Sequence, residues 1–529
     1  MEKRQKKPHE RAKSLSQELN DLDRKLTELL VRRSELMARS AERRVSKNAK
    51  LVDPREEKAL WKIWKEVRDA RELDPRIWEQ IFNLTNALSY SRAEKSRSMK
   101  DYTLFPRRTP FSLATAGPPS SFCARLHLCL AAVGERSLHL KGAVLNDPTI
   151  ELIKLLNQAG ASIEWNAEGD INVSRDRALH FNRKSIFCGQ NPLNFFFALS
   201  LAVHGLGTCR LTGGTRLKTL DLHPLRETLS TMGARVVHLD PHSSGLPVRI
   251  ESTGRVPEEF EFKAITPPEF VQAFIVVSAA LGKRISVSWP DEMTCRALPG
   301  SVAQILADTT YAQIQPSGIE FPEKGLTLPE HPHIPLDPVL SAYLMALPLG
   351  AEGNVLLTGR WPARADAEEI QFILQQVLEL EIHKEEVRTG RKGDYPATVS
   401  SRKFSPLGFA ALLLTSAQEY RWGLTDEDDI EFADDFLRSA GFEYEWSQSA
   451  LVITGRTVLE PPTVSAPTSE WGMAMALVAF RLQGLVLRNP GIVASLWPGF
   501  WKIYNSLHKQ DSPEKKGNGN ERKRKRILT

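Results

Sequence analysis

The stretch NPLNFFFALSLAVH, residues 191–204, is an almost wholly apolar helix that opens with a capping Asn and a Pro. A helix without a polar face has to be buried on every side. The pattern occurs six times along the chain, followed by a turn, a strand, an amphipathic helix and a short hairpin. The six apolar helices are predicted to begin near Ser120, Pro192, Pro267, Pro338, Pro406 and Ser469.

The starts and ends of these repeats follow local rules. Four residues that precede a Pro are predicted to cap their helices, namely Asn191, Thr266, Asp337 and Ser405. In the second half of a repeat, as in LRSAGFEYEW (437–446), a helix ends near Gly and a strand begins. The spacing of roughly 60 to 75 residues exceeds that of common solenoid repeats. The sequence therefore predicts an α/β body of six repeated βαβαβ units whose apolar helices pack against each other.

Composition is ordinary for a soluble globular protein, with 41% hydrophobic and 25% charged residues among 529. No apolar run reaches the roughly 18 residues of a membrane span, and the basic start lacks the apolar core of a secretory leader. The five cysteines form no CxxC pair, which favours buried thiols in a reducing cytoplasm. We expect a cytoplasmic protein with no metal site, no cofactor and no membrane partner.

The net charge of +6 comes from the two ends of the chain. Residues 1–13 carry about +4 and residues 508–529 about +5, so the part between them is slightly acidic. Both ends are polar enough to be disordered. KRKR in the tail is typical of a solvated segment, although it also suits an acidic or nucleic-acid surface. We expect no nucleic-acid partner.

Residues 14–95 are predicted to form a helical domain. Leucines recur at steps of three and four along one long helix, at Leu15, Leu19, Leu22, Leu26, Leu29 and Leu36. Arg33 falls on the same apolar seam, where a guanidinium needs a partner, an anion or access to solvent. Shorter helices start at Asp53-Pro54 and Asp74-Pro75. One long helix leaves its seam uncovered, so a homodimer that exchanges long helices is expected.

This segment resembles the all-helical chorismate mutases, in LNDLDRKLTELLVRRSELM (19–37), VDPREE (52–57) and LDPRIWEQIFNLTNALSYS (73–91). In that family cationic side chains bind the two substrate carboxylates and stabilise charge on the ether oxygen. The resemblance implies catalytic roles for Arg33, Arg44, Arg55 and Glu56, and substrate binding by Asp53 and Ser89. Chorismate would be the substrate.

Three positions depart from the mutase pattern. Arg44 stands where the family has Lys, which keeps the charge but changes the geometry. The Arg that the partner chain donates falls at Ser16, although Lys13 or Arg11 are close in sequence. The Gln of the third helix is Ala93. The alternative is therefore a helical dimerisation module that keeps the fold without the activity.

The six repeats, followed by FWKIYNSL (500–507), resemble 5-enolpyruvylshikimate-3-phosphate (EPSP) synthase and its enolpyruvyl-transferase relatives. The resemblance implies two globules of three units each over residues 105–507, joined to the head by a linker at 96–104. The first globule would span about 118–334, and the second about 335–507 plus 105–117. Helix N-termini meet in the cleft between such globules and favour phosphate and carboxylate groups.

The resemblance also implies which cations this body keeps. In SSFCAR (120–125), Ser121 and Arg125 match the family, while Ser120 replaces its catalytic Lys. GGTRLKTL (213–220) keeps Arg216 and Lys218, where the family contacts phosphoenolpyruvate. These four matching residues would bind substrate. An equally good reading makes Arg125 a structural ion-pair partner.

Most other binding positions of the family are replaced, by Leu193, Phe196, Pro267, Pro268, Glu269, Leu407 and Asp429. The loss of one charge-assisted contact to a buried anion costs about 1.5–3 kcal/mol. Acidic replacements such as Glu269 and Asp429 would also repel anionic substrates. Glu427, Asp428, Asp429 and Glu431 together are more typical of a solvated helix start.

The sequence therefore predicts a protein of aromatic amino-acid biosynthesis with a chorismate mutase head and a body that has lost ordinary enolpyruvyl transfer. One alternative is an active 3-phosphoshikimate 1-carboxyvinyltransferase with a rebuilt site, which would bind shikimate-3-phosphate and phosphoenolpyruvate. The other is a non-catalytic metabolite-binding or scaffold protein.

Overall fold

A computed structural model describes most of the chain. The described residues are 15–46, 54–71, 74, 78, 81–82, 85–86, 101–104, 110–175, 178–239, 244–291, 298–323, 326–363, 365–424, 427–457, 460–482 and 484–509. The chain divides into two compact units, Met1–Tyr102 with Leu487–Ile492, and Thr103–Val486 with Val493–Thr529. The predicted leader 1–13 and the tail from residue 510 lie outside the described residues. None of the described helices is both long and apolar enough to cross a membrane.

Among its described residues, the first unit has one long helix, α1 (Leu15–Ser46), and one shorter helix, α2 (Pro54–Ala70). Of the third helix predicted to start at Asp74-Pro75, the described residues 78, 81–82 and 85–86 are helical, and most of the rest lies outside the described residues. An aromatic cluster fastens α2 to the following segment: the Trp64 ring lies 5.0 Å from Trp78 and 5.4 Å from Phe82 between ring centroids. The Trp78 indole N–H also donates to the Trp64 carbonyl at 2.8 Å. The leucines of the α1 seam are at least half exposed, at Leu19, Leu22, Leu26, Leu29 and Leu36.

The second unit repeats one chain pattern, most clearly in β17 (Thr398–Lys403), α15 (Pro406–Thr415), β18 (Glu419–Leu424), α16 (Glu427–Ser439), β19 (Phe442–Trp446) and β20 (Ala450–Arg456). Strand β17 pairs with β18 in parallel, and β20 joins β18 and β19 in antiparallel pairs. The sheet order is therefore β17-β18-β20-β19. The complete unit is βαβαββ rather than the predicted βαβαβ, because the hairpin after the amphipathic helix supplies two strands to the same sheet.

The described strands form six sheets, and the chain visits them in two groups of three. The first group is the first globule, with sheet orders β3-β5-β4, β6-β7-β9-β8 and β10-β11-β13-β12. Its strands are β3 (Leu138–Leu140), β4 (Ser162–Trp165), β5 (Ile171–Ser174), β6 (Ser185–Phe187), β7 (Leu206–Thr212), β8 (Ala234–His238), β9 (Val248–Thr253), β10 (Glu259–Glu261), β11 (Ile285–Ser288), β12 (Gln313–Gln315) and β13 (Gly318–Phe321). Its helices are α4 (Ser121–Val133), α5 (Asp147–Ala159), α6 (Pro192–His204), α7 (Thr215–Lys218), α8 (Leu225–Thr231), α9 (Pro268–Leu281) and α11 (Gly300–Thr309).

The second globule holds the other three sheets, with orders β15-β16-β14-β2, β17-β18-β20-β19 and β1-β22-β21. Its further strands are β1 (Tyr102–Thr103), β2 (Phe111–Ala116), β14 (Gly353–Thr358), β15 (Leu378–Ile382), β16 (Glu386–Arg391), β21 (Thr463–Val464) and β22 (Val486–Leu487). Its further helices are α12 (Pro338–Met345), α13 (Leu347–Gly350), α14 (Ala365–Val377), α17 (Ser469–Val478), α18 (Gly491–Leu496) and α19 (Phe500–Lys509).

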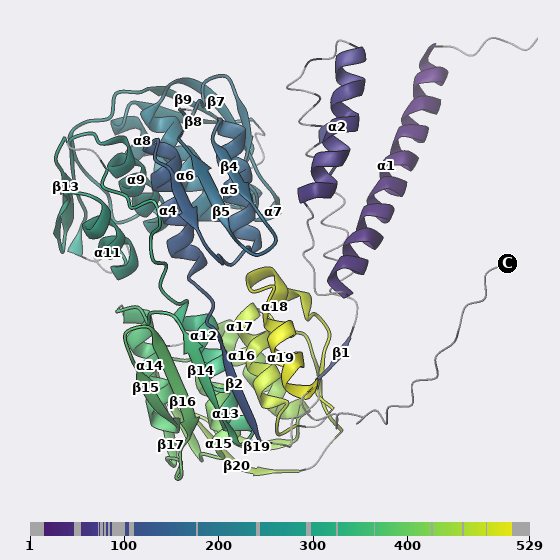
Figure 1. Ribbon diagram of the computed structural model, residues 1–529, viewed down its shortest axis with the longest axis vertical. Helices are drawn as coiled ribbons and strands as arrows, with labels where there is room; N and C mark the ends of the chain where they lie inside the picture. The colour runs from purple at the N-terminus through teal and green to yellow at the C-terminus, as the bar shows by residue number, and fades with distance from the viewer. Residues whose placement is uncertain are drawn as a thin grey trace, which may run out of the picture. The chain divides into compact units, whose positions relative to one another are not determined.

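The apolar helices α4, α6 and α9 form the centre of the first globule, with the small sheets around them (Figure 1). Every residue of α6 from Leu193 onward is buried. Phe196 and Phe270 meet edge to face where α6 packs against α9, with ring centroids 5.9 Å apart. Burying helices with no polar face among three sheets is the packing that the repeats require.

Two neighbouring chain segments connect the globules. Strand β2 pairs in parallel with β14 of the second globule, with Phe111 opposite Gly353. After β2 the chain crosses to the first globule through residues 118–120, and it returns to the second globule through residues 335–337, which lie beside them. Two backbone hydrogen bonds join the crossings, from Ser120 N to Pro335 O and from Asp337 N to Pro118 O, each 2.8 Å long. The globules are thus linked by a short two-stranded connection.

Three of the four predicted Pro-adjacent caps are confirmed. The side chains of Asn191, Asp337 and Ser405 accept hydrogen bonds from the backbone of the first helical turn. The prediction for Thr266 is wrong, because α9 begins at Pro268 and Pro267 occupies the cap position without a side-chain bond. Pro268 disfavours the helical conformation for the residue before it, so the helix starts one residue later than predicted.

His204, at the end of α6, is a buried polar residue of the core. One ring nitrogen, Nδ1, lies 2.9 Å from the Ser200 carbonyl oxygen, and the other, Nε2, lies 3.2 Å from the Ser278 hydroxyl. The pKa of His204 is lowered from 6.5 to about 4, mainly by burial, with a smaller contribution from the nearby Lys283 ammonium and against the opposing effect of the Ser200 hydrogen bond. The folded first globule therefore holds the imidazole in its neutral form.

We predict an acid-sensitive step in the stability of the first globule. Because the unfolded chain binds a proton at His204 more tightly than the folded chain, stability is present above pH 6.5 and is lost as the pH falls toward 4. The free energy of unfolding should fall by up to about 3 kcal/mol from this group. Denaturant unfolding at several pH values between 7.5 and 4 measures this effect. The free energy of unfolding should fall less steeply with decreasing pH in His204→Leu than in the natural protein. The exposed His223→Leu serves as control, and equal slopes in all three proteins would contradict the prediction.

Candidate functional site

The body gathers three helix N-termini in the first globule. Ser120, Asn146 and Asn191 are the capping residues of α4, α5 and α6. The Asn146 amide joins two of these ends, because its Nδ2 donates to the Ser121 hydroxyl at 3.0 Å. The same Nδ2 donates to the carbonyl of Leu496 in the second globule at 3.1 Å. Helix starts carry partial positive charge that attracts anions, so this cluster is a candidate anion site.

Arg125 contributes the buried cation of this cluster. Its Nη1 donates to the Asn191 and Asn194 side-chain oxygens at 3.0 and 3.1 Å. Burial lowers the pKa of Arg125 to about 10, against the opposing pull of the Glu151 carboxylate. Its Nε is buried with no hydrogen-bond partner. These contacts tie α4 to the start of α6 through side-chain amides, and substrate binding by Arg125 stays a prediction.

Glu151 of α5 occupies the N-terminus of α6. Its Oε2 accepts hydrogen bonds from the backbone N–H groups of Gln190 and Asn191, at 2.9 and 3.3 Å. These are donors that a helix start offers to a bound anion. The chain therefore places its own carboxylate where an external phosphate or carboxylate would bind.

The two other predicted binding cations lie on α7. The side chains of Arg216 and Lys218 are exposed. The backbone N–H of Arg216 donates to Gln190 Oε1 at 3.1 Å, which connects α7 to the turn that Glu151 occupies. Hydrogen bonds at the N-termini of α5 and α6 therefore connect three of the predicted binding positions. These are Ser121, Arg125 and the backbone of Arg216 on α7.

The second globule presents carboxylates at its helix starts. Asp337 caps α12, with Oδ1 3.0 Å from the Leu340 N–H. Asp429 accepts a hydrogen bond from the Trp471 indole N–H at 2.6 Å. Burial raises the pKa of Glu470, and the negative charges of Asp429 and Asp337 raise it further, while Lys403 opposes them. Asp428 and Glu431 are exposed, as expected of a solvated helix start, but Asp429 turns inward.

These carboxylates form no evident metal site. In the part of the chain that the structure describes, no group of three or more His, Cys, Asp or Glu side chains is arranged to hold a metal ion. The described cysteines Cys123, Cys129, Cys188 and Cys209 are all buried free thiols. Asp337 and Asp429 instead accept hydrogen bonds from the protein, from the Leu340 backbone and the Trp471 indole.

In the first unit, Arg33 is the predicted mutase residue whose side chain the structure describes. Its Nη2 donates to Asn86 Oδ1 at 2.7 Å, and its guanidinium carbon lies 5.9 Å from the centroid of the Trp64 ring. The Arg33 side chain, on α1, therefore contacts both α2 and the segment that follows α2. Arg44 lies on α1, and Arg55 and Glu56 in the first turn of α2, but their side chains lie outside the described residues. Asp53, Ser89 and Ala93 also lie outside them.

Several site residues were missed by sequence reasoning. Asn86 and Trp64 hold Arg33, Glu151 fills the α6 start, and Trp471 holds Asp429. Their residue types carry no signal of their own, because each partner is distant in sequence. Asn194 is the exception: it follows the capping Asn191 by one helical turn, a spacing that would have placed both amides on one face.

Comparison with solved structures supports the fold. The chain superimposes on EPSP synthase from Acinetobacter baumannii with a TM-score of 0.63 and 14% sequence identity, covering 77% of this chain and 98% of that one. The body is EPSP synthase-like. The enolpyruvyl transferase NikO from Streptomyces tendae gives a TM-score of 0.57 at 15% identity, covering 77% of this chain and 96% of that one.

Sequence relatives agree over the same region. The 3-phosphoshikimate 1-carboxyvinyltransferase of Neisseria meningitidis serogroup B is 23% identical over 421 residues, which is 74% of this chain and 94% of the relative. The pentafunctional AROM polypeptide 2 of Lodderomyces elongisporus is 25% identical over 227 residues, which is 41% of this chain and 14% of that polypeptide. The chain thus spans only a small part of the AROM polypeptides that it matches. No protein-family profile matches the chain.

We predict that Glu470→Gln stabilises the second globule at neutral pH. A carboxyl whose folded pKa lies above its unfolded value favours folding at low pH, and that contribution is lost as the pH rises through the folded pKa. Gln carries no charge at either pH, so Glu470→Gln should have a higher free energy of unfolding than the natural protein at pH 7.5 and a similar one near pH 4. Denaturant unfolding at both pH values measures this difference. Glu368→Gln, an exposed position on α14, is the control, and a destabilised Glu470→Gln at pH 7.5 would contradict the prediction.

Proposed function

We propose that this chain is a cytoplasmic protein of aromatic amino-acid biosynthesis. In this proposal the N-terminal helices convert chorismate to prephenate, and the EPSP synthase-like body no longer carries out ordinary enolpyruvyl transfer. The observation that carries the second part is the Glu151 carboxylate on the N–H groups of Gln190 and Asn191. The cytoplasmic location rests on the buried free thiols of the four described cysteines.

The charges of the body argue against binding two anionic substrates. Enolpyruvyl transfer brings shikimate-3-phosphate together with phosphoenolpyruvate, so the site has to neutralise a phosphate and a carboxylate at close range. Glu151 competes for the helix-start donors of the first globule. In the second globule burial raises the pKa of Glu470, and the negative charges of Asp429 and Asp337 raise it further. A further anion at either place would be repelled rather than bound.

The head keeps the feature that mutase chemistry requires most, a positioned cation. Chorismate rearranges without a covalent intermediate, so acceleration depends on fixing its reactive conformation and stabilising charge on the ether oxygen. Asn86 and Trp64 restrict the Arg33 guanidinium in the first unit. We propose that Arg33, Arg44 and Arg55 bind the substrate carboxylates and ether oxygen, with Glu56, Asp53 and Ser89 completing the site.

A homodimer through α1 is part of this proposal. Its seam carries Leu22, Leu26 and Leu29, which are 60%, 54% and 67% exposed in the single chain. Ile63 and Val67 of α2 are also exposed, at 57% and 45%. Apolar rows of this length on a helix call for a partner surface. A second copy supplies an identical seam and would bring its own N-terminal cations, Lys13 or Arg11, toward the site at which Ser16 replaces an Arg.

An active 3-phosphoshikimate 1-carboxyvinyltransferase is the second candidate. Alignment over 94% of the meningococcal enzyme favours it, because no large part of that enzyme is missing from this chain. Ser121, Arg125, Arg216 and Lys218 would then bind its substrates. That function requires Glu151 to leave the α6 start or to be protonated when substrate binds.

We predict that paired assays on one preparation separate these functions. The purified chain should form prephenate from chorismate and should release no phosphate from shikimate-3-phosphate plus phosphoenolpyruvate. Arg33→Ala should lower prephenate formation by about 100- to 1000-fold, the effect of losing one charge-stabilising group. The neighbouring Arg32→Ala is the matched control, since Arg32 is exposed on α1 and pairs with Glu35. No turnover of chorismate would refute the mutase proposal, and phosphate release would refute the proposal for the body.

We predict that the α1 seam determines the oligomeric state. Light scattering after size-exclusion chromatography should give twice the chain mass of 59.4 kDa for the natural sequence. The double variant Leu22→Glu and Leu29→Glu should elute as a monomer, because charges on both seams repel each other. Leu424→Glu, equally exposed on β18, should remain dimeric. A monomeric natural protein would contradict this prediction.

A further inference from the structure

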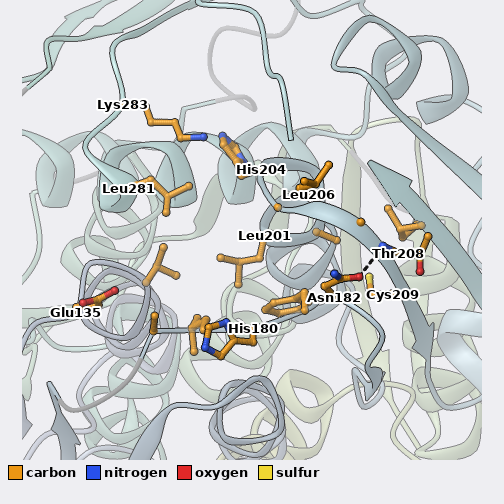
Figure 2. A pocket seen from close by; sticks show the side chains of 18 residues that line it. Glu135, His180, Asn182, Leu201, His204, Leu206, Thr208, Cys209, Leu281 and Lys283 are labelled. Atoms are coloured by element: carbon orange, nitrogen blue, oxygen red, sulfur yellow. Dashed lines mark hydrogen bonds between the residues drawn. The ribbon is translucent and has the colours of Figure 1, made fainter. Parts of the chain in front are cut away.

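A pocket of about 340 Å³ opens at the far end of the central helices of the first globule (Figure 2). Its walls come from the ends of α4, α6 and α9, from the start of β7 and from the segment before β6. The anion cluster lies at the opposite, N-terminal ends of α4 and α6. Since α6 has 13 residues, about 20 Å of helix separates the two places. The pocket is therefore not part of the candidate site described above.

The buried part of the pocket wall is mainly apolar, and the polar side chains of His180, Asn182 and Thr208 lie at its exposed edge. Val133, Phe181, Leu201 and Ile250 line it and are buried. Two leucines of the lining remain in solvent, Leu206 at 75% and Leu281 at 37% exposure. The volume falls at the small end of the range for ligand pockets. These features suit the apolar part of one small molecule, which would cover the two exposed leucines.

The buried His204 forms a fixed wall of this pocket. Both of its ring nitrogens lie within hydrogen-bond distance of protein oxygens, those of Ser200 and Ser278. Its ring also packs on Phe274, with centroids 4.9 Å apart. His204 thus has no ring nitrogen to spare for a ligand, and the polar recognition has to come from the rim.

The rim carries two opposite charges, Glu135 and Lys283. Both side chains are exposed, and within the described residues neither has a hydrogen-bond or ion-pair partner. Glu135 follows Gly134, the last residue of the α4 cap, and Lys283 follows Gly282, the cap of α9. Figure 2 shows both around the same pocket as Leu281. Helix C-terminal carbonyls add partial negative charge, which favours a ligand cation near Glu135.

We propose that this pocket binds a small α-amino acid with an apolar side chain. The side chain would fill the apolar interior, the carboxylate would pair with Lys283, and the ammonium would pair with Glu135 and the carbonyl end of α4. A phosphorylated ligand is disfavoured, because three helix C-termini face the pocket and one rim charge is negative. This site goes beyond the proposed mutase function and does not depend on it.

Calorimetric titration of the full chain with L-phenylalanine tests the proposal. We expect saturable binding of one molecule per chain, with a Kd between about 50 μM and 1 mM for a ligand of this size. Two analogues that each lack one charge, 3-phenylpropanoate and 2-phenylethylamine, should bind about 3- to 10-fold more weakly, as expected for charge pairs at an exposed rim. Leu206→Asn should weaken L-phenylalanine binding by a similar factor. Leu424→Asn, on a leucine that is 72% exposed on β18, should not.

Charge variants assign each end of the ligand. Lys283→Gln should bind L-phenylalanine and 2-phenylethylamine equally, because the pairing that distinguishes them is gone. Glu135→Gln should bind L-phenylalanine and 3-phenylpropanoate equally. Arg33→Ala should bind L-phenylalanine as the natural chain does, which separates this pocket from the mutase site. The proposal is overturned if L-phenylalanine does not bind, if binding is insensitive to Leu206→Asn, or if it disappears in Arg33→Ala.

Discussion

The architecture of the body depends on one constraint: a helix that is apolar on every face cannot border water. A single three- or four-stranded sheet covers only one side of such a helix, so each repeat is unstable alone. Three repeats together enclose three helices, as α4, α6 and α9 show with edge-to-face contacts such as Phe196 on Phe270. The backbone groups that such a helix leaves unpaired lie at its ends, where caps such as Asn191 satisfy part of the first turn. The ends are therefore the places where polar chemistry can occur.

Sequence patterns anticipated what is local and missed what is distant. Capping by Asn191, Asp337 and Ser405 follows from residue type and the adjacent Pro, and the apolar runs mark the helices that become the core. Thr266 failed as a cap for an equally local reason, the second Pro that follows it. Glu151 lies 39 residues before the Gln190 amide that it contacts, and Trp471 lies 42 residues after Asp429. Pairings over such separations are set by packing of the repeats, which no single-sequence periodicity encodes.

In both globules, polar groups at the helix ends make contacts with other groups of the protein. In the first, the Arg125 guanidinium and the Glu151 carboxylate are used to connect α4, α5 and α6. In the second, Asp429 accepts a hydrogen bond from the Trp471 indole and lies near the half-buried Glu470. Such internal pairs stabilise the fold at positions where a catalyst would keep donors and cations available for a substrate. The body is EPSP synthase-like, and these contacts support our proposal that it no longer carries out ordinary enolpyruvyl transfer.

Strand β2 has a consequence for how the protein is made. Its residue Ser112 contacts Asn354 of β14, although 242 positions separate them in the chain. During synthesis from the N-terminus, β2 emerges early and waits until β14 leaves the ribosome. Meanwhile the intervening residues of the first globule contain all three of its central helices and can complete their own core. The order of translation thus favours an internal globule that folds first and holds an unpaired strand beside it until the outer globule closes.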